Sequence, residues 1–229
     1  MTTIDAYTGI PELTVSLDGG VLTVTLNRPD SLNSLNAAML SALADAVEHA
    51  ADDPQVRAVR AITSLPKPAV AVVQGPTAGV GVSLALACDI VLASEKAFFL
   101  LAFTKIGLMP DGGASALVAA SIGRARAMKM ALLAERVSAT EAFDIGLIST
   151  VYPADELEAG VAAVLDKLVS GPAIALRKTK QAINAATLTE LDAAIGRESE
   201  GQLILLGSSD FREGTKAFQE HRSPTFTDD

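Results

Sequence analysis

The sequence contains little cysteine, histidine and aromatic residue, and these shortages exclude several classes of protein. Its 229 residues include 1 cysteine, 2 histidines, 2 tyrosines and no tryptophan. A single cysteine, Cys88, cannot build a disulfide framework, and the N-terminus shows no secretory signal, so we expect a cytoplasmic protein. With one cysteine and no paired His/Asp spacing, no metal site is expected.

The chain also lacks an excess of positive charge. It has 27 acidic and 18 basic residues, which gives a net charge of −9, and no block of Lys and Arg interleaves with aromatic residues. This composition argues against nucleic acid and anionic membrane surfaces as partners. An anionic ligand would need local cations.

One long stretch, residues 68–88, lacks charged residues altogether. Its length would allow a membrane span, but Gln74 and Gly75-Pro76 interrupt it. A strand of β-branched residues, a glycine turn and a small buried helix fit the same residues, and this is the interpretation we favour. Because 49% of the chain is apolar, it can bury a sizeable core.

Hydrophobic periodicity predicts the order of elements. Alternation on both sides of Asp18-Gly19-Gly20 predicts an antiparallel hairpin over residues 13–26. Beyond the hairpin, apolar spacing predicts a helix over 37–51, strands over 55–59 and 69–74 (the second fully buried), a helix from about Val82 to Cys88, a strand over 90–94, a short apolar segment over 97–101, a loop over 104–115 and two helices.

The remainder of the chain turns from mixed to helical. Ser138 and Glu141 form a capping box, Gly146 is placed to end that helix, and residues 147–151 predict a strand. From residue 154 to about 219 the pattern is helical, with Pro172 and Asp210 as helix starts. We expect an α/β core over residues 1–170 and a helical segment over residues 171–229.

The junction Val59-Arg60 conflicts with this order. Only nine residues separate Val59 from Ala69, whereas two parallel strands need a crossover of roughly a dozen or more. Three explanations stay open: the strands are not parallel neighbours, a stretch has been deleted, or a loop is left out of the sequence. We favour the last.

The stretch "GPTAGVGVSLALACD", residues 75–89, is the first candidate for chemistry. Gly79-Val80-Gly81 precedes a predicted helix, whose first N–H groups have no partner within the helix and favour negative charge. The partner is then a phosphate or a carbonyl oxygen that becomes negative during reaction. No P-loop lysine or Rossmann acidic residue supports a nucleotide, and close packing alone is an equally good explanation.

The stretch "LPKPAVAVVQGPTAGVGVSLALACDIVLASEKAFF" resembles the central signature of the crotonase (enoyl-CoA hydratase/isomerase) family. "LNRPDSLNSLN", "GLMPDGG", "SATEAFDIGLISTVYPADEL" and "REGTKAFQEHRSPTF" resemble the same family in order and spacing, over nearly the whole chain. The resemblance implies an α/β crotonase-like spiral of β-β-α turns, a C-terminal helical trimerisation segment, and assembly as a homotrimer or a dimer of trimers.

The resemblance also implies an acyl-CoA thioester as substrate or ligand, with no permanently bound cofactor. One oxyanion donor would be the backbone N–H of Val80, flanked by Gly79 and Gly81. The second donor comes, in the family, from a loop that this sequence lacks, and the absence falls at Val59-Arg60.

The two glutamates of the family's hydratases are replaced. Alignment through "LALACD" and "GLMP" places Ser83 at the first position and Phe103 at the second, and neither side chain is a base at neutral pH. An ordinary hydratase is therefore not expected, and an isomerase with its carboxylate at the second position is in doubt.

Asp111, in the loop "MPDGGAS", is the carboxylate that remains. It resembles the nucleophile position of the family's dehalogenases, and it is our candidate acid, base or nucleophile. The alternative is an aspartate that caps the following helix.

Other candidates follow from the resemblance. The anionic end of coenzyme A would be held by Arg28, His221 and Arg222, and the acyl group by Phe99 and Phe103, although a surface role for the cations and a core role for the aromatic residues stay open.

Three hypotheses follow for an acyl-CoA-binding protein of fatty-acid or acyl-CoA metabolism: a lyase or isomerase of noncanonical crotonase chemistry, a non-catalytic acyl-CoA binding or regulatory protein, and a degenerate hydratase with slow residual activity.

Overall fold

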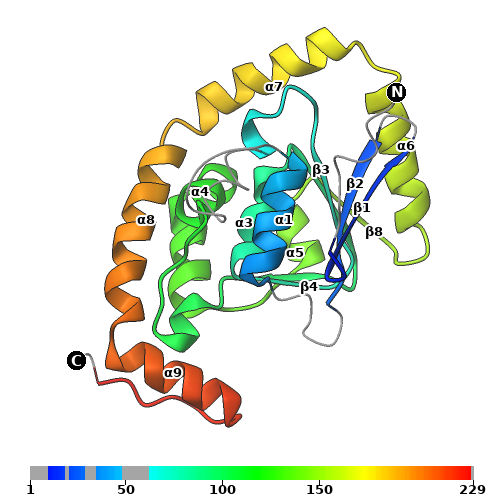
Figure 1. Ribbon diagram of the computed structural model, residues 1–229. Helices are drawn as coiled ribbons and strands as arrows, with labels where there is room; N and C mark the ends of the chain where they lie inside the picture. Colours follow the sequence, from blue (N-terminus) through cyan, green and yellow to red (C-terminus); the bar gives the residue numbers. More distant parts are fainter. Residues whose placement is uncertain (1–9, 19–20, 29–34, 48–61, 228–229) are drawn as a thin grey trace.

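The computed structural model describes residues 10–18, 21–28, 35–47 and 62–227 (Figure 1). The predicted hairpin is confirmed: β1 (Leu13–Asp18) pairs antiparallel with β2 (Val21–Leu26), and Leu13 lies opposite Leu26. The helix α1 (Ala37–Val47) follows, and the Asn36 side chain caps it by accepting the Met39 N–H at 2.8 Å. The predicted strand over residues 55–59 lies outside the described residues.

The centre of the molecule is a spiral in which the chain visits two three-stranded sheets in turn. One sheet has the order β3-β5-β8 and is parallel, and the other has the order β4-β6-β7. Two β-β-α turns come first, and a return through the second sheet to the first follows: β3 (Val70–Val73), β4 (Pro76–Ala78), α3 (Val80–Ala87); β5 (Ile90–Ser94), β6 (Phe98–Leu100), η3 (Phe103–Ile106), α4 (Ala114–Leu133); β7 (Val137–Ser138), α5 (Ala139–Asp144), β8 (Thr150–Tyr152). The predicted crotonase-like α/β spiral is confirmed.

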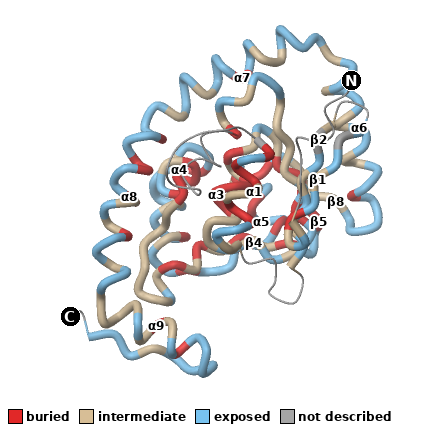
Figure 2. Tube along the Cα trace, viewed as in Figure 1, coloured by how far each residue is buried: buried red, intermediate tan, exposed pale blue. Residues whose placement is uncertain are grey.

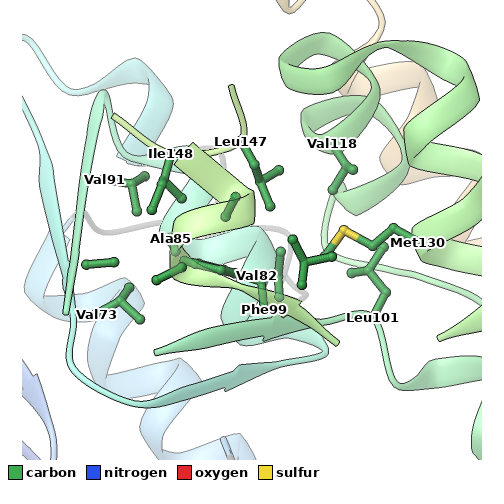
Figure 3. Close-up of a cluster of buried hydrophobic side chains, with 14 of the residues drawn as sticks. Val73, Val82, Ala85, Val91, Phe99, Leu101, Val118, Met130, Leu147 and Ile148 are labelled. Atoms are coloured by element: carbon green, nitrogen blue, oxygen red, sulfur yellow. The ribbon is translucent and has the colours of Figure 1, made fainter. Parts of the chain in front are cut away.

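The core fills the space between these sheets and the helices α3, α4 and α5. Phe99 has no exposed surface and packs in one apolar cluster with Val82, Val118 and Leu147 (Figure 3). A second cluster joins the hairpin and α1 to α3, α4 and a C-terminal helix. The uncharged stretch 68–88 therefore consists of two strands and the eight-residue helix α3, in agreement with the favoured interpretation.

One predicted burial and three predicted boundaries are wrong in detail. β3 is not fully buried, because Val72 is 43% exposed on a strand that lies at the edge of its sheet in the part of the chain that the structure describes. α3 begins at Val80 rather than Val82, and the strand expected from residue 147 begins at Thr150. The last helix is capped by Ser208, which accepts the Phe211 N–H, so Asp210 lies in its first turn.

The C-terminal helices form an arm around the outside of the core (Figures 1 and 2). They are α6 (Leu157–Val169), α7 (Ala173–Thr187, starting after Pro172 as predicted), α8 (Leu191–Leu206) and α9 (Ser209–Gln219). Most of the arm is exposed, whereas buried residues concentrate in the spiral (Figure 2). Among the described residues no single helix is long and apolar enough to cross a bilayer; α6 and α7 pass that test only as a pair bent by 105°.

Candidate active site

The start of α3 presents backbone N–H groups. Gly79 caps the helix with φ 57° and ψ −129°, a conformation that strongly favours glycine, and its own N–H bonds the Leu100 carbonyl at 2.9 Å. Val80 is the first helical residue. Among the described residues only Ala134 and His221 combine a side chain with a positive φ, so the valine costs the turn no strain. The first N–H groups of a helix lack carbonyl partners within it, so this end can receive an anionic oxygen.

Ser83 and Phe103, the two residues singled out in the sequence, lie at this helix start: Ser83 is the fourth residue of α3, and the Phe103 ring lies beside Gly79. Ser83 is completely buried, and its hydroxyl donates to the Asp111 backbone carbonyl at 2.9 Å. That bond commits its proton, so Ser83 supports a loop, and a neutral hydroxyl is too weakly basic to act as a base at neutral pH. The Phe103 ring lies 3.6 to 4.0 Å from the place a side chain on Gly79 would take, and it makes this side of the site apolar.

The loop with Asp111 reaches the same place. A Cβ on Gly112 would lie 3.4 Å from the Ser83 side chain and 3.6 Å from Val80 Cγ1. The structure therefore brings Gly79, Val80, Ser83, Phe103 and Asp111 together, from segments that are up to 32 residues apart in the sequence.

The Asp111 carboxylate does not cap the following helix. The N-cap of α4 is Gly113, with φ 85° and no side-chain cap of its own. Glu198, on α8, takes that role: its carboxylate accepts the N–H groups of Gly113 at 2.6 Å and Ser115 at 2.8 Å. The capping explanation of Asp111 is thereby excluded.

Asp111 is bound instead by Gln202, one turn further along α8. The Gln202 amide donates to Asp111 Oδ2 at 2.7 Å and accepts the Met109 N–H at 3.3 Å. Sequence reasoning missed both α8 residues. Their four-residue spacing would have served a solvated helix face equally well, and nothing in the pattern marks a contact across 91 residues.

The predicted cations come from two other segments of the chain. Arg28 is half-buried, two residues after β2. His221 and Arg222 follow α9, and the Arg222 guanidinium pairs with Glu213 and Glu220 of its own chain. Arg222 is therefore already matched with carboxylates before any phosphate binds. Phe99 packs in the core, so of the two predicted acyl contacts only Phe103 lies beside the helix start.

No further nucleophile or metal site adds to this arrangement in the part of the chain that the structure describes. Burial raises the pKa of the Cys88 thiol to about 12, with a smaller contribution from Asp89, so the thiolate is absent at neutral pH. Over the described residues, no group of three or more His, Cys, Asp and Glu could hold a metal ion.

Comparison with known proteins places this geometry in a family. A family model described as enoyl-CoA hydratase/isomerase matches residues 16–60 and 59–229. The chain is 34% identical to 1,2-epoxyphenylacetyl-CoA isomerase of Escherichia coli, over 92% of this chain and 96% of that protein. It is 37% identical to a probable enoyl-CoA hydratase of Rhodobacter capsulatus, over 91% and 95%. The crystal structure of an enoyl-CoA hydratase from Mycobacterium avium subsp. paratuberculosis superimposes with a TM-score of 0.92 and 59% identity, over 95% and 99%.

The same comparisons address the junction at Val59-Arg60. The family model matches in two stretches that meet there. The alignment with the E. coli isomerase spans 252 positions, whereas 92% of 229 residues is about 211, so about 41 positions of that protein have no counterpart here. These findings support the two explanations in which residues are missing at the junction.

The family model matches most of the chain, two relatives are more than 30% identical over most of their length, and the spiral is shared with a solved structure. The chain belongs to the enoyl-CoA hydratase/isomerase, or crotonase, family.

Proposed function

We propose that the protein binds an acyl-CoA thioester and isomerises it, with the Val80 N–H polarising the thioester carbonyl and Asp111 moving a proton. The observation that carries the proposal is the position of Asp111. Its loop contacts Val80 and Ser83 at the helix start, and its carboxylate is not used as a helix cap.

One carboxylate suits an isomerisation better than a hydration. Hydration needs a base for water and an acid for the α-carbon, and Ser83 and Phe103 supply neither. In an isomerisation the carboxylate removes a proton from carbon, the electron pair moves into the polarised thioester as an enolate, and the same carboxylic acid returns the proton at another carbon. The similarity to the 1,2-epoxyphenylacetyl-CoA isomerase of E. coli supports an isomerase.

Assembly is part of the proposal. Large apolar side chains on the arm are more than half exposed, as expected of a surface that subunits cover. They are Val169, Ile174, Ile183, Leu203, Ile204 and Phe218. We propose that they contact other copies in a homotrimer or a dimer of trimers.

A second function is favoured by the two-part family match. The segment that is absent at Val59-Arg60 supplies, in the family, the second oxyanion donor, and a site with one donor polarises a thioester less. The alternative is therefore a binding protein that holds an acyl-CoA without converting it.

The deciding experiment is a mass-spectrometric time course in D₂O with saturated, enoyl, 3-hydroxy and aryl CoA thioesters. We expect one class to be retained and isomerised, which appears as a changed chromatographic retention time at unchanged mass, with deuterium in the product only where the Asp111 carboxyl exchanges its proton with solvent before returning it. Asp111→Asn should lower the rate by about 10²- to 10⁴-fold and leave retention intact. Asp144→Asn, an exposed aspartate of α5, is the matched control and should change neither.

Each other outcome has a defined meaning. Retention without conversion supports the binding protein. Slow hydration that survives Asp111→Asn supports the degenerate hydratase, and no retention of any thioester contradicts all three.

A further inference from the structure

We propose that Gln202 is a positioning residue for Asp111: its amide holds the Asp111 carboxylate ionised and in one orientation beside the start of α3. The inference rests on the proposed function. Its support comes from the contacts between α8 and the loop over residues 109–115, which carries Asp111.

Two side chains of α8 hold alternate residues of this loop. Gln202 binds Met109 and Asp111, and Glu198, one turn earlier on the same helix face, binds Gly113 and Ser115. Glu198 is 1% exposed and Gln202 is 9% exposed, so solvent does not compete for these bonds. The carboxylate of Asp111 is thus held by a buried, rigid element.

The direction of the Gln202 amide follows from its partners. The Met109 N–H can only donate, so the amide oxygen must face it, and the amide NH₂ group must then face Asp111. An NH₂ group binds the oxygen of a carboxylate more strongly than the carbonyl oxygen of the neutral acid, so this bond favours the ionised form. The same bond fixes which oxygen, Oδ2, is turned toward α8.

Other contacts already hold the loop in place without this bond. Met109 lies against the backbone of Gly201, and Leu191 and Ile195 lie against Gly113. Apolar packing and the Glu198 cap thus account for the loop's position. The bond to Oδ2 orients the Asp111 carboxylate and favours its charged form. Both effects matter more to the reaction than to folding.

Few charged groups face the loop among the described residues. Glu198 is the nearby carboxylate on α8, and its charge is met by the first N–H groups of α4. α3 offers the Ser83 hydroxyl and no charged residue, the first turn of α4 has no acidic residue, and Lys105 of η3 is exposed. The hydrogen bond from Gln202 is a short, buried polar contact of the Asp111 carboxylate.

The test compares Gln202→Met, which keeps the volume and removes the amide, with Glu200→Met on the exposed face of the same helix. Kinetics use the thioester that the wild-type protein isomerises fastest. We expect Gln202→Met to lower kcat by about 10- to 100-fold, as for a lost hydrogen bond to a charged group, with KM within about 2-fold. In the Asp111→Asn background the same change should cost nothing further.

A second readout does not need turnover. ¹³C NMR of the Asp111 carboxyl carbon should show its titration midpoint move to higher pH in Gln202→Met and stay unchanged in Glu200→Met. An unchanged midpoint, or an equal loss of kcat with and without Asp111, would overturn the inference. If the midpoint moves but Asp111→Asn leaves turnover intact, the proposed function fails and the positioning role stands.

Discussion

The spiral core and the C-terminal arm are stabilised in different ways. A cluster of apolar side chains fills the centre of the spiral, whose described residues include two buried serines, Ser83 and Ser94. The arm contributes some apolar contacts, such as Leu191 and Ile195, but three of the five buried polar side chains of the described residues belong to it: Lys180, Glu198 and Gln202. The core is thus stabilised by non-directional burial, and the arm is fixed to it by directional bonds.

These directional bonds join the arm to two segments: the Asp111 loop and the chain just before β3. Glu198 and Gln202 bind the Asp111 loop. Lys180, the one buried residue of α7, lies 2.8 Å from Asp89 and donates to the carbonyls of Ile62 and Lys67, just before β3. A polar contact leaves little freedom of register, so the arm sets the position of loops that the core alone would not fix.

Removing the buried charge of α7 should have the largest effect on this attachment. Lys180→Met keeps the length of the side chain but leaves Asp89 and two carbonyls without their cation. We expect the free energy of unfolding to fall by about 3 kcal/mol, the low end of the range for a broken buried pair. Urea denaturation at one fixed protein concentration measures the change.

Lys178→Met provides the control on the same helix. Lys178 is exposed, and its replacement should change stability by less than about 0.5 kcal/mol. Equal stability of the two variants would show that Lys180 does not hold the arm.

On the core side, Gly79→Ala should have an intermediate effect. The obstacle is the backbone rather than space, because φ is 57° while the new Cβ would meet only ordinary contacts with the Phe103 ring. We expect a loss of about 1–3 kcal/mol in stability together with weaker thioester binding, since the Val80 N–H would be displaced. Thermal denaturation and calorimetric titration with the retained thioester measure both.

Gly75→Ala separates this strain from a general effect of alanine. Gly75 does not have a positive φ, and nothing lies within 4 Å of an added Cβ. Its replacement should raise stability by about 0.4–1 kcal/mol. A loss at Gly75 equal to that at Gly79 would contradict the assignment of strain to the helix cap.

The sequence predicted the features that depend on local pattern. Alternation around Asp18 located the hairpin, the Ser138 capping box located α5, and the glycines on either side of Val80 located the start of α3 to within two residues. Each rests on residues within a few positions of one another. The resemblance to the family then supplied the order of the spiral, which periodicity alone does not fix.

The contacts of Asp111 with α8 could not be predicted from the sequence, for a physical reason. Gln202 and Glu198 lie about ninety positions away, on a helix whose exposed face carries similar polar residues. A carboxylate before two glycines fits a helix cap by local rules, and only the fold shows that α8 provides the cap instead. Likewise, Arg222 looked like a free cation because its partner Glu213 lies nine residues earlier.

Removing the ion pair at the exposed end of the arm, between Arg222 and Glu213, should have the smallest effect on stability. Hydrogen bonds from Arg222 and from the Thr225 N–H lower the pKa of Glu213 from 4.5 to about 2. A lowered carboxyl pKa adds stability to the bound tail above pH 4.5, and this contribution is lost as the pH falls from there toward 2. The Thr225 amide shift in NMR spectra should therefore stay constant from pH 7 to pH 5 and move below it, while Glu213→Gln should move it at pH 7. Glu213→Gln should hardly change the free energy of unfolding in urea at pH 7, because solvent screens the pair between Glu213 and Arg222. A loss of stability as large as that of Lys180→Met would contradict the view that burial separates the two attachments.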